Sequence, residues 1–416
     1  MTKLLFTFLL WPAVSFAAYN NYNSILIGEK AAGMGGAYSA IANDPAASSF
    51  YNPATLSRMK GSSLSTAVSV YTKSDIRFGN TGGFENAPFE MNQGTFTPIP
   101  TASGSVYTFG NFAFGISIVS PDYYSFDGEV ESTTEKSNFL HEKDESLWVG
   151  GTLALNISPK SSLGLTMYYT SRTFQRINTV KEKLSSGDII VTNEEKNLTN
   201  NSIIYILGYF KELSPLWNLG MSLRLPSLEI SGRGAYSQFR LSTVDGLVTD
   251  IFESELLSDT NVPQRINIGV SHEYSPRLLL SVELQRFDST SYYDFENENL
   301  PNTIRDFVEH DPLTNIHFGA EYKVKSWLLF RAGLYTNFSS APDIPNAPTR
   351  RYQDKINMWG FSAHYAFLTS KQSSLTLGGF YSGGKGESVQ FLGDSYAKIN
   401  KSIQYFTFLV GTAYDF

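Results

Sequence analysis

From residue 62 to the C-terminus, apolar and polar residues alternate with a period of two in one segment after another. An alternation that lasts about ten residues is typical of a β-strand whose two faces meet different surroundings. In the segment 112–120, for example, one face carries Phe112, Phe114, Ile116 and Ile118. The pattern predicts fourteen strands, at about 62–72, 99–109, 112–120, 146–157, 161–177, 201–212, 217–232, 264–275, 277–289, 314–324, 327–338, 354–367, 373–385 and 401–416.

The connections between these predicted strands alternate strictly between short and long. Short turns lie at 110–111, 158–160, 214–216, 275–276, 325–326 and 369–372. Long loops lie at 73–98, 121–145, 178–200, 233–263, 290–313, 339–353 and 386–400. All long loops therefore lie on one side of the sheet, as in the even-numbered transmembrane β-barrels of bacterial outer membranes. We expect the last strand to pair with the first, because an open sheet edge in lipid leaves backbone groups unsatisfied.

One long loop has a helical pattern. Within 244–257, Leu247, Ile251 and Leu256 lie on one face of a helix, while acidic residues lie elsewhere. This spacing predicts a short amphipathic helix. Such a helix either captures apolar ligands at the mouth of the barrel or simply buries a few loop residues.

The first residues are organised differently. Lys3 precedes an apolar run over 4–14, and Ser15 and Ala17 fit a small-x-small cleavage site. This is the pattern of a secretory signal peptide over 1–17, with the mature chain beginning at Ala18. The apolar run is too short to cross a membrane as a helix, and no later segment has 18 consecutive apolar residues.

Composition agrees with an exported membrane barrel. Aromatic residues make up 14% of the chain and cysteine is absent, which excludes a disulfide scaffold and cysteine-based chemistry. The net charge of −7 argues against nucleic acid as a partner. The five histidines lack metal-ligand spacing and there is no Gly-x-Ser-x-Gly motif, so we expect no enzyme activity, catalytic residue, metal or cofactor.

The segment 18–60 precedes the first strand and is rich in small residues. Gly33, Gly35 and Gly36 suit close backbone packing, and Asn52-Pro53 is a turn signal. Fourteen strands enclose a lumen that side chains alone do not fill. The segment is therefore either a surface loop or, in our interpretation, an N-terminal plug (18–60) inside a barrel formed by 61–416.

The run GMGGAYSAIANDPAASSFYNPATLS resembles the N-terminal signature of the FadL-type outer-membrane proteins, which carry fatty acids and other hydrophobic compounds. The matching runs are 33–37, 43–47 and 51–54, and the rest of the chain matches in architecture. The resemblance implies a luminal hatch whose signature residues include Gly33, Gly35, Gly36, Asn52, Pro53 and Ala54. Relatives that assist secretion have a similar signature.

Charged residues also occur on the predicted inward faces: Arg172, Arg224, Arg265, Glu273, Glu283, His317, Glu321, Arg331 and His364. They either pair with one another in a solvated lumen, or one or two arginines bind the anionic head of a ligand. Arg172, Arg224 and Arg331 are the candidates for that role. The strand at 201–212 is apolar on both faces, so its inward residues Ile204, Ile206 and Phe210 contact either an amphipathic ligand or the plug.

Aromatic residues end the chain. Tyr414 and Phe416 resemble the C-terminal signal that the outer-membrane assembly machinery reads. This signal indicates the outer membrane of a Gram-negative bacterium, where the protein contacts lipid and lipopolysaccharide. We expect the protein to be a monomer there. The favoured function is passive transport of hydrophobic compounds such as long-chain fatty acids or hydrocarbons. A FadL-like barrel that serves as a secretion or assembly partner is the alternative, and a general porin is a third possibility.

Overall fold

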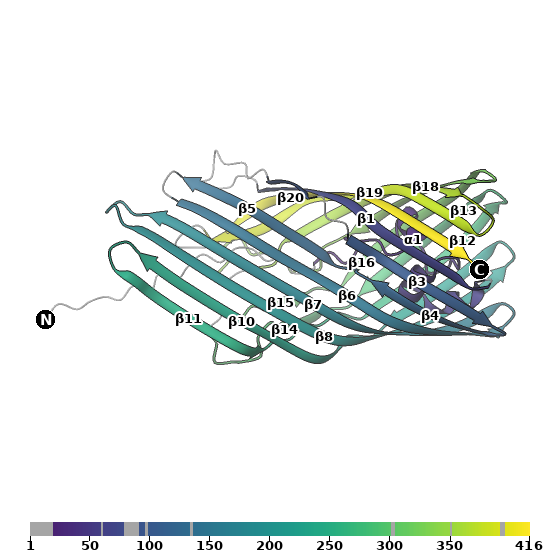
Figure 1. The fold of residues 1–416 in the computed structure, drawn as a ribbon, viewed down its shortest axis with the longest axis horizontal. Helices are drawn as coiled ribbons and strands as arrows, with labels where there is room; N and C mark the ends of the chain where they lie inside the picture. The colour runs from purple at the N-terminus through teal and green to yellow at the C-terminus, as the bar shows by residue number, and fades with distance from the viewer. Residues whose placement is uncertain are drawn as a thin grey trace.

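The strands form one antiparallel sheet that closes into a fourteen-stranded barrel (Figure 1). The computed structural model describes residues 20–59, 61–78, 91–95, 99–133, 136–300, 304–349, 352–391 and 396–416, so the predicted signal peptide lies outside the described residues. The barrel strands are β1 (Ser63–Phe78), β3 (Ile99–Phe109), β4 (Phe112–Val119), β5 (Tyr123–Thr133), β6 (Lys136–Ser158), β7 (Ser161–Lys183), β8 (Ile189–Ser214), β9 (Trp217–Arg224), β10 (Leu228–Ser242), β12 (Arg265–Ser275), β13 (Leu278–Phe287), β16 (Leu313–Lys325), β17 (Leu328–Asn337), β18 (Lys355–Leu368), β19 (Ser373–Phe391) and β20 (Tyr396–Asp415).

The expected closure of the barrel is confirmed. β20 pairs with β1 from Ser63↔Asp415 to Phe78↔Lys401, with one register shift at Ser69/Tyr71. β4 with β5, and β9 with β10, each make up one transmembrane strand that is interrupted near a proline. The predicted continuous strand 217–232 is therefore wrong at 225–227, where Pro226 has no N–H to donate to a ladder.

Alternation across the wall separates an apolar outer face from a polar, plug-facing inner face. In β4, alternate residues are exposed and buried: Phe112, Phe114, Ile116 and Ile118 face outwards and are each more than 40% exposed. A band of this kind suits contact with lipid. The alternation in the sequence therefore indicated the correct outward face.

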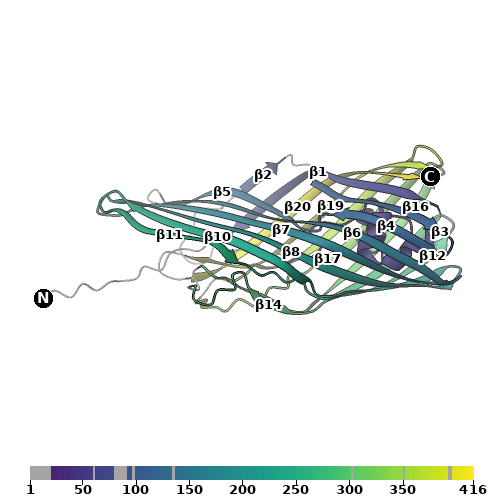
Figure 2. The same ribbon diagram turned by 60° about the horizontal axis from the view of Figure 1, so that its bottom comes forward.

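Several predicted long loops are strands that continue beyond the membrane. β6, β7 and β8 contain 23, 23 and 26 residues. At about 3.3 Å per residue, they greatly exceed an apolar band about 25 Å tall. In Figures 1 and 2 the ends of β5 to β8, β10 and β11 extend together as a tall wall on one side of the barrel.

The helix predicted over 244–257 is wrong. That segment is β11 (Gly246–Leu257), which pairs with β10 from Arg233↔Leu257 to Ser242↔Gly246. Pairing with a neighbouring strand satisfies the backbone and overrides the helical spacing. A register irregularity lies near Glu255, whose φ is 56°, and Leu256 and Ile251 both pack in an apolar cluster with Phe295.

Smaller elements complete the outer end. β2 (Met91–Thr95) pairs with β1, and β14 (Thr290–Tyr293) forms a separate hairpin sheet with β15 (Phe307–His310).

The N-terminal segment lies inside the barrel as a plug, in the position that the sequence indicated. It contains α1 (Glu29–Gly33), α2 (Pro45–Tyr51) and the 3-10 helix η1 (Pro53–Arg58). Asp44 caps α2 by accepting a hydrogen bond from the Ala47 N–H, and Pro45 occupies the first turn. Figure 2 shows this purple segment enclosed by the strands. None of the helices in the described ranges is long and apolar enough to cross a membrane.

The β1–β20 seam can be tested by cross-linking, since the chain has no cysteine. Thr66 and Thr412 are direct partners on the outer face. Antiparallel partners have Cα atoms about 4.5–5.5 Å apart, a separation that a disulfide spans. We expect Thr66→Cys/Thr412→Cys to cross-link under oxidation, as detected by a mobility shift of the denatured protein and by peptide mass spectrometry. The control Thr66→Cys/Phe408→Cys places the second thiol four residues along β20, and equal cross-linking there would contradict the register.

Candidate functional site: the plug and the luminal cavities

Side chains of the barrel wall satisfy much of the plug's irregular backbone. Polar groups buried away from water need partners, and the plug has little regular secondary structure to supply them. Wall side chains on several strands donate to plug carbonyl groups at 2.6–3.0 Å, among them Asn156 to Ser57, Ser162 to Ala54, Thr166 to Ser49, Ser222 to Tyr51, Arg265 to Phe50 and Ser271 to Ala40. The plug is therefore held around much of its circumference.

The glycine run of the plug packs on β16 to β18. The Gly35 N–H donates to Ser362 Oγ at 3.1 Å, and that hydroxyl donates to Gly33 O at 3.0 Å. His317 Nδ1 donates to Gly35 O at 2.7 Å. A Cβ at Gly35 would lie 3.2 Å from the backbone of Gly333 in β17, and Gly35 has a positive φ of 63°. This close approach of two backbones explains why small residues are needed here.

Gly33 and Gly36 lie in equally tight places. A Cβ at Gly33 would be 3.0 Å from both Arg331 Cβ and His364 Nδ1. A Cβ at Gly36, where φ is 82°, would be 3.3 Å from His317 Nδ1. The three glycines that the sequence singled out thus all face the same part of the wall.

A buried carboxylate holds the next part of the plug. Glu283 on β13 accepts hydrogen bonds from the Tyr38 N–H at 2.9 Å and from the Ser39 N–H at 2.7 Å. Gln285 donates to its other oxygen at 3.1 Å. The alternation placed Glu283 on the inward face, but nothing in the sequence pointed to its role as an acceptor for the plug backbone.

Asn52 connects two parts of the plug to the wall. Its Nδ2 donates to Ser39 O at 2.7 Å and to Tyr209 O in β8 at 3.0 Å, while its Oδ1 accepts from the Ala54 N–H at 3.2 Å. Pro53 begins η1 directly afterwards. The side chain therefore uses both donors and its acceptor at the plug–wall interface.

The part of the wall that faces Asn52–Ala54 consists of small residues. Gly164 and Gly208 are direct partners in the β7–β8 ladder, and a Cβ on either glycine would overlap Asn52, Pro53 or Ala54. In register with them lie Ala154 and Ser222. A belt of small residues thus lets the plug backbone reach the wall.

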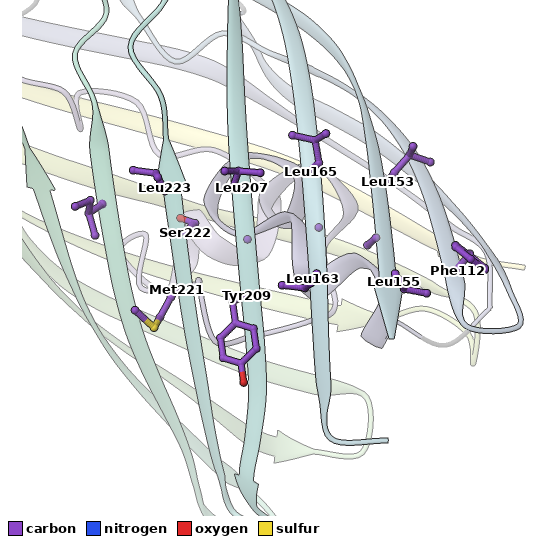
Figure 3. Close-up of a pocket in the computed structure, with 14 residues that line it drawn as sticks. Phe112, Leu153, Leu155, Leu163, Leu165, Leu207, Tyr209, Met221, Ser222 and Leu223 are labelled. Atoms are coloured by element: carbon purple, nitrogen blue, oxygen red, sulfur yellow. The ribbon is translucent and has the colours of Figure 1, made fainter. Parts of the chain in front are cut away.

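The outer surface over this belt is hollowed. Figure 3 shows Leu153, Leu165, Leu207 and Leu223 among the side chains around the hollow, which has a volume of ≈ 700 Å³. The strands that carry the lining residues are paired one to the next behind the hollow, from β4–β6 through β6–β7, β7–β8 and β8–β9 to β9–β12. The hollow is therefore a lipid-facing feature of a continuous wall and not an opening in it.

A luminal cavity of ≈ 60 Å³ lies on the long-loop side of the plug, and both Arg172 and Arg224 line it. Arg172 is bound by Asp144 through two hydrogen bonds of 3.0 and 2.6 Å, and it donates to Thr260 at 2.7 Å. Arg224 donates to Pro263 O at 2.9 Å, and its guanidinium lies over the rings of Trp148 and Phe287. No carboxylate in the described residues forms an ion pair with Arg224, so it is the freer of the two cations.

Arg331 is not part of that cavity. It lies on the turn side of the plug, where its Nε donates to Glu321 at 2.6 Å. The three arginines that the sequence grouped together are therefore split between two sites. Of the remaining inward charges, Glu283, His317 and His364 are buried, while Glu273 is exposed near a turn.

The inward apolar patch of β8 packs against the plug. Ile204 and Ile206 lie in one buried cluster with Phe50 and Tyr51 of the plug and with Trp148 and Tyr168 of the wall. Phe210 lies beneath the guanidinium of Arg58, 5.6 Å from ring centroid to Cζ. Of the two interpretations left open by the sequence, these contacts favour plug packing.

The outer loops cover the cavity. Lys196 of β8 is buried between Asp294 and Asp306, donates to Ile304 O at 2.7 Å, and lies over the Phe295 ring. These contacts clamp the segment around β14 and β15 to the tall wall. The sequence did not indicate this clamp, because the 178–200 segment has the composition of a solvated loop.

His310 of β15 lines the same cavity. Burial lowers the pKa of its imidazole to about 3, and the positive charge of Arg172 acts in the same direction. Its Nδ1 lies 2.8 Å from Ser340 Oγ. The ring is therefore neutral at physiological pH and contributes an uncharged polar group to the cavity.

The two aromatic residues that resemble an assembly signal lie at the C-terminal end of β20. Tyr414 and Phe416 are 42% and 73% exposed and form an edge-to-face pair at the turn end.

Within the described ranges, no group of three or more acidic, histidine or cysteine side chains is arranged to hold a metal.

Comparison with known proteins gives one family. The family model described as outer membrane protein transport protein (OMPP1/FadL/TodX) matches residues 16–350. No curated protein matches the sequence.

Solved structures show the same fold at low sequence identity. A FadL homologue from Pseudomonas aeruginosa superposes with a TM-score of 0.65 and 15% identity, covering 95% of this chain and 100% of its own. The Pseudomonas putida toluene transporter TodX superposes with a TM-score of 0.64 and 14% identity, covering 94% of this chain and 99% of its own. The Ralstonia pickettii toluene transporter TbuX superposes with a TM-score of 0.56 and 15% identity, covering 96% of this chain and 100% of its own. At these identities the likeness is one of fold.

Asn52→Ala tests whether this side chain anchors the plug. The change removes the hydrogen bonds to Ser39 O and Tyr209 O and the acceptor of the Ala54 N–H, at a cost of about 1–3 kcal/mol for a buried group left unpaired. We expect normal insertion but a looser plug, measured as increased sensitivity to large antibiotics and as added conductance in planar bilayers. Asn201→Ala is the control, since Asn201 bonds only Ser231 in an exposed position. Wild-type uptake and wild-type leakage in a normally inserted Asn52→Ala protein would contradict anchoring.

Gly208→Ala tests the belt of small residues. The new methyl group would overlap Asn52 Oδ1 and the plug backbone, and such overpacking costs about 1–3 kcal/mol. We expect the folded band on unheated gels to be lost several degrees below the wild-type temperature. Gly151→Ala is the matched control, because a Cβ there meets nothing within 4 Å. Equal melting of both variants would show that the plug does not need this contact.

Proposed function

Because the chain belongs to the outer membrane protein transport family (OMPP1/FadL/TodX), we propose that it carries hydrophobic compounds passively across the outer membrane of a Gram-negative bacterium. The seated plug is the observation that carries this proposal. Most of its residues from Leu26 to Leu56 are buried in the lumen, and the cavity beside Arg172 and Arg224 measures ≈ 60 Å³. A general porin, by contrast, needs an open and water-filled lumen.

Passage then requires the plug to rearrange. Ligand pockets usually measure about 300–1,000 Å³, so the cavity of ≈ 60 Å³ beside the plug is too small for a cargo molecule. The plug is held by apolar packing against the wall and by hydrogen bonds from wall side chains, and water or cargo can replace these hydrogen bonds one at a time. Such bonds contribute about 0.5–1.5 kcal/mol each, so part of the plug can move while the barrel ladders stay intact.

Two cargo classes fit, namely long-chain fatty acids and hydrocarbons. Hydrocarbons are supported by the solved neighbours, which include two toluene transporters and the CymD monoaromatic hydrocarbon channel. An acid is supported by Arg224, whose guanidinium lies beside the rings of Trp148 and Phe287 without a described carboxylate partner. The cavity thus combines a cation with aromatic surface.

The alternative is a barrel that acts as a secretion or assembly partner. It is favoured by the apolar side chains that β10, β11 and their turn expose outside the barrel, with Val244 and Phe252 each more than 70% exposed. Exposed apolar surface of this kind is typical of partner contacts. A protein that co-purifies in stoichiometric amount would support this alternative.

Uptake by cells distinguishes the cargo classes. We expect cells that express the protein to take up labelled oleate, labelled toluene or both faster than cells without it. If oleate is a cargo, Arg224→Gln is expected to reduce its uptake about ten-fold or more, because a hydrogen bond to a charged group contributes about 1.5–3 kcal/mol. Toluene uptake is expected to stay within about two-fold, since toluene has no charge for Arg224 to bind.

Arg286→Gln is the control for this experiment, because Arg286 is exposed and donates to Thr314. Absence of uptake of both compounds in cells with normally inserted protein would contradict transport of these cargoes and favour the partner alternative.

A further inference from the structure

The hollow on the lipid-facing surface, which we call the outer hollow, lies directly behind the anchor of the plug. Gly164 and Gly208 line it on the lipid side and meet the segment 52–54 on the luminal side. Tyr209 also faces both ways, because its ring lines the hollow while its carbonyl accepts from Asn52 at 3.0 Å. Only one layer of strand backbone therefore separates the outer hollow from the plug.

The outer hollow is apolar and has the size of a ligand site. Its volume of ≈ 700 Å³ lies within the usual range of about 300–1,000 Å³. Leucines from four successive strands, β6 to β9, line it: Leu153, Leu155, Leu163, Leu165, Leu207 and Leu223. Inside a bilayer such a surface is covered by lipid acyl chains, because there is no water at that depth.

One cation without a partner faces outwards at the turn end of the hollow. Lys211 lies two residues after Tyr209 in β8, so the two side chains point to the same face of the sheet, about 7 Å apart along the strand. Lys211 is exposed and has no ion pair or side-chain hydrogen bond with a described residue. Its ladder partners are Ser161 in β7 and Leu219 in β9, which carry no charge. The lysine is therefore available to an anion.

The neighbouring charges keep this rim positive. Glu212, the next residue along β8, lies 3.8 Å from both Arg58 and Lys160. Two cations thus share one carboxylate, and Lys211 adds a further positive charge. Glu273 of β12 is separated from β8 by β9. The turn end of the outer hollow therefore attracts negative charge in a chain whose net charge is −7.

Aromatic side chains place this end of the wall at the membrane surface. Trp217, Tyr274 and Trp327 all lie near short turns and are exposed. Exposed tryptophan and tyrosine collect at the level of the lipid headgroups. Lys211 lies three residues before Ser214, which pairs with Trp217. Because a lysine can extend along the wall towards water, its ammonium reaches the phosphates of the periplasmic leaflet.

We propose that the outer hollow binds a phospholipid of the periplasmic leaflet, with an acyl chain along the leucines and the phosphate on the Lys211 ammonium and the Tyr209 hydroxyl. Figure 3 shows this hydroxyl pointing away from Leu207, and no described residue hydrogen-bonds it. The bound chain would pack on the outer side of the backbone that holds the plug anchor. This proposal does not rest on the proposed transport function, because these side chains face lipid and not the lumen.

Photo-cross-linking tests the site on the full-length protein in dodecyl maltoside micelles, where no other phosphate competes. The probes are a phosphatidylglycerol with a diazirine midway along one acyl chain and the diacylglycerol of the same chains, which lacks the phosphate. We expect phosphatidylglycerol to label peptides that contain Leu165 or Leu207 about five-fold more than diacylglycerol does, the contribution of one lysine to binding an anionic lipid. Peptides that contain Leu334 or Phe361, exposed residues of β17 and β18, are expected to show no such difference.

Two variants change different parts of the site. Lys211→Gln removes the cation and is expected to reduce labelling by phosphatidylglycerol about five-fold. Met221→Trp adds bulk to an exposed residue that lines the hollow, so it is expected to reduce labelling by both probes. Arg286→Gln is the matched control, because Arg286 is an exposed cation paired with Ile266 at the other end of the hollow and donates to Thr314. Labelling of this control is expected to equal that of the wild type.

Three results would overturn the proposal. Equal labelling of the hollow by the two probes, or equal labelling of all outward peptides, would show ordinary contact with lipid. Labelling that Lys211→Gln does not reduce would remove the phosphate contact. Labelling that Arg286→Gln reduces and Lys211→Gln does not would assign the hollow to a lipid of the outer leaflet. Lys211→Gln changes an exposed side chain, so the test stays valid if Met221→Trp does not insert.

Discussion

The structure depends on one constraint, namely that an irregular segment enclosed in a barrel must have its backbone groups satisfied. The wall meets this need with side chains rather than with strands. Ser162, Ser222 and Arg265 donate to plug carbonyl groups, and Glu283 accepts from two plug N–H groups. Residues on several strands therefore act together to fix one conformation of the plug.

Close approach is the second requirement, and it explains the small residues on both sides of the interface. Gly35 of the plug meets Gly333 of β17, while Asn52 and Pro53 meet Gly164 and Gly208 of β7 and β8. Hydrogen bonds from short wall side chains reach the plug only because the two backbones lie so near each other.

The plug divides the lumen into two chemically different spaces. On the outer side, Arg172 is neutralised by Asp144, whereas Arg224 lies among aromatic rings. On the turn side, Arg331 donates to Glu321, and the buried carboxylate of Glu29 also acts on its charge. The two spaces therefore differ in how their arginines are paired.

The sequence by itself determined the barrel, its closure and the presence of a plug. A membrane imposes an apolar outer face on every strand, so the alternation shows directly in the residues, and the glycines at 33, 35 and 36 signal close packing. The extensions of β6 to β8 and the strand β11 were decided by tertiary pairing, because no lipid imposes a pattern outside the membrane. The sequence also did not predict that Asn52 donates to the Tyr209 carbonyl, because the two residues are 157 positions apart in the chain. Alternation states that Arg172, Arg224 and Arg331 point inwards, but only the folded barrel decides their height along the lumen and hence which of them meet.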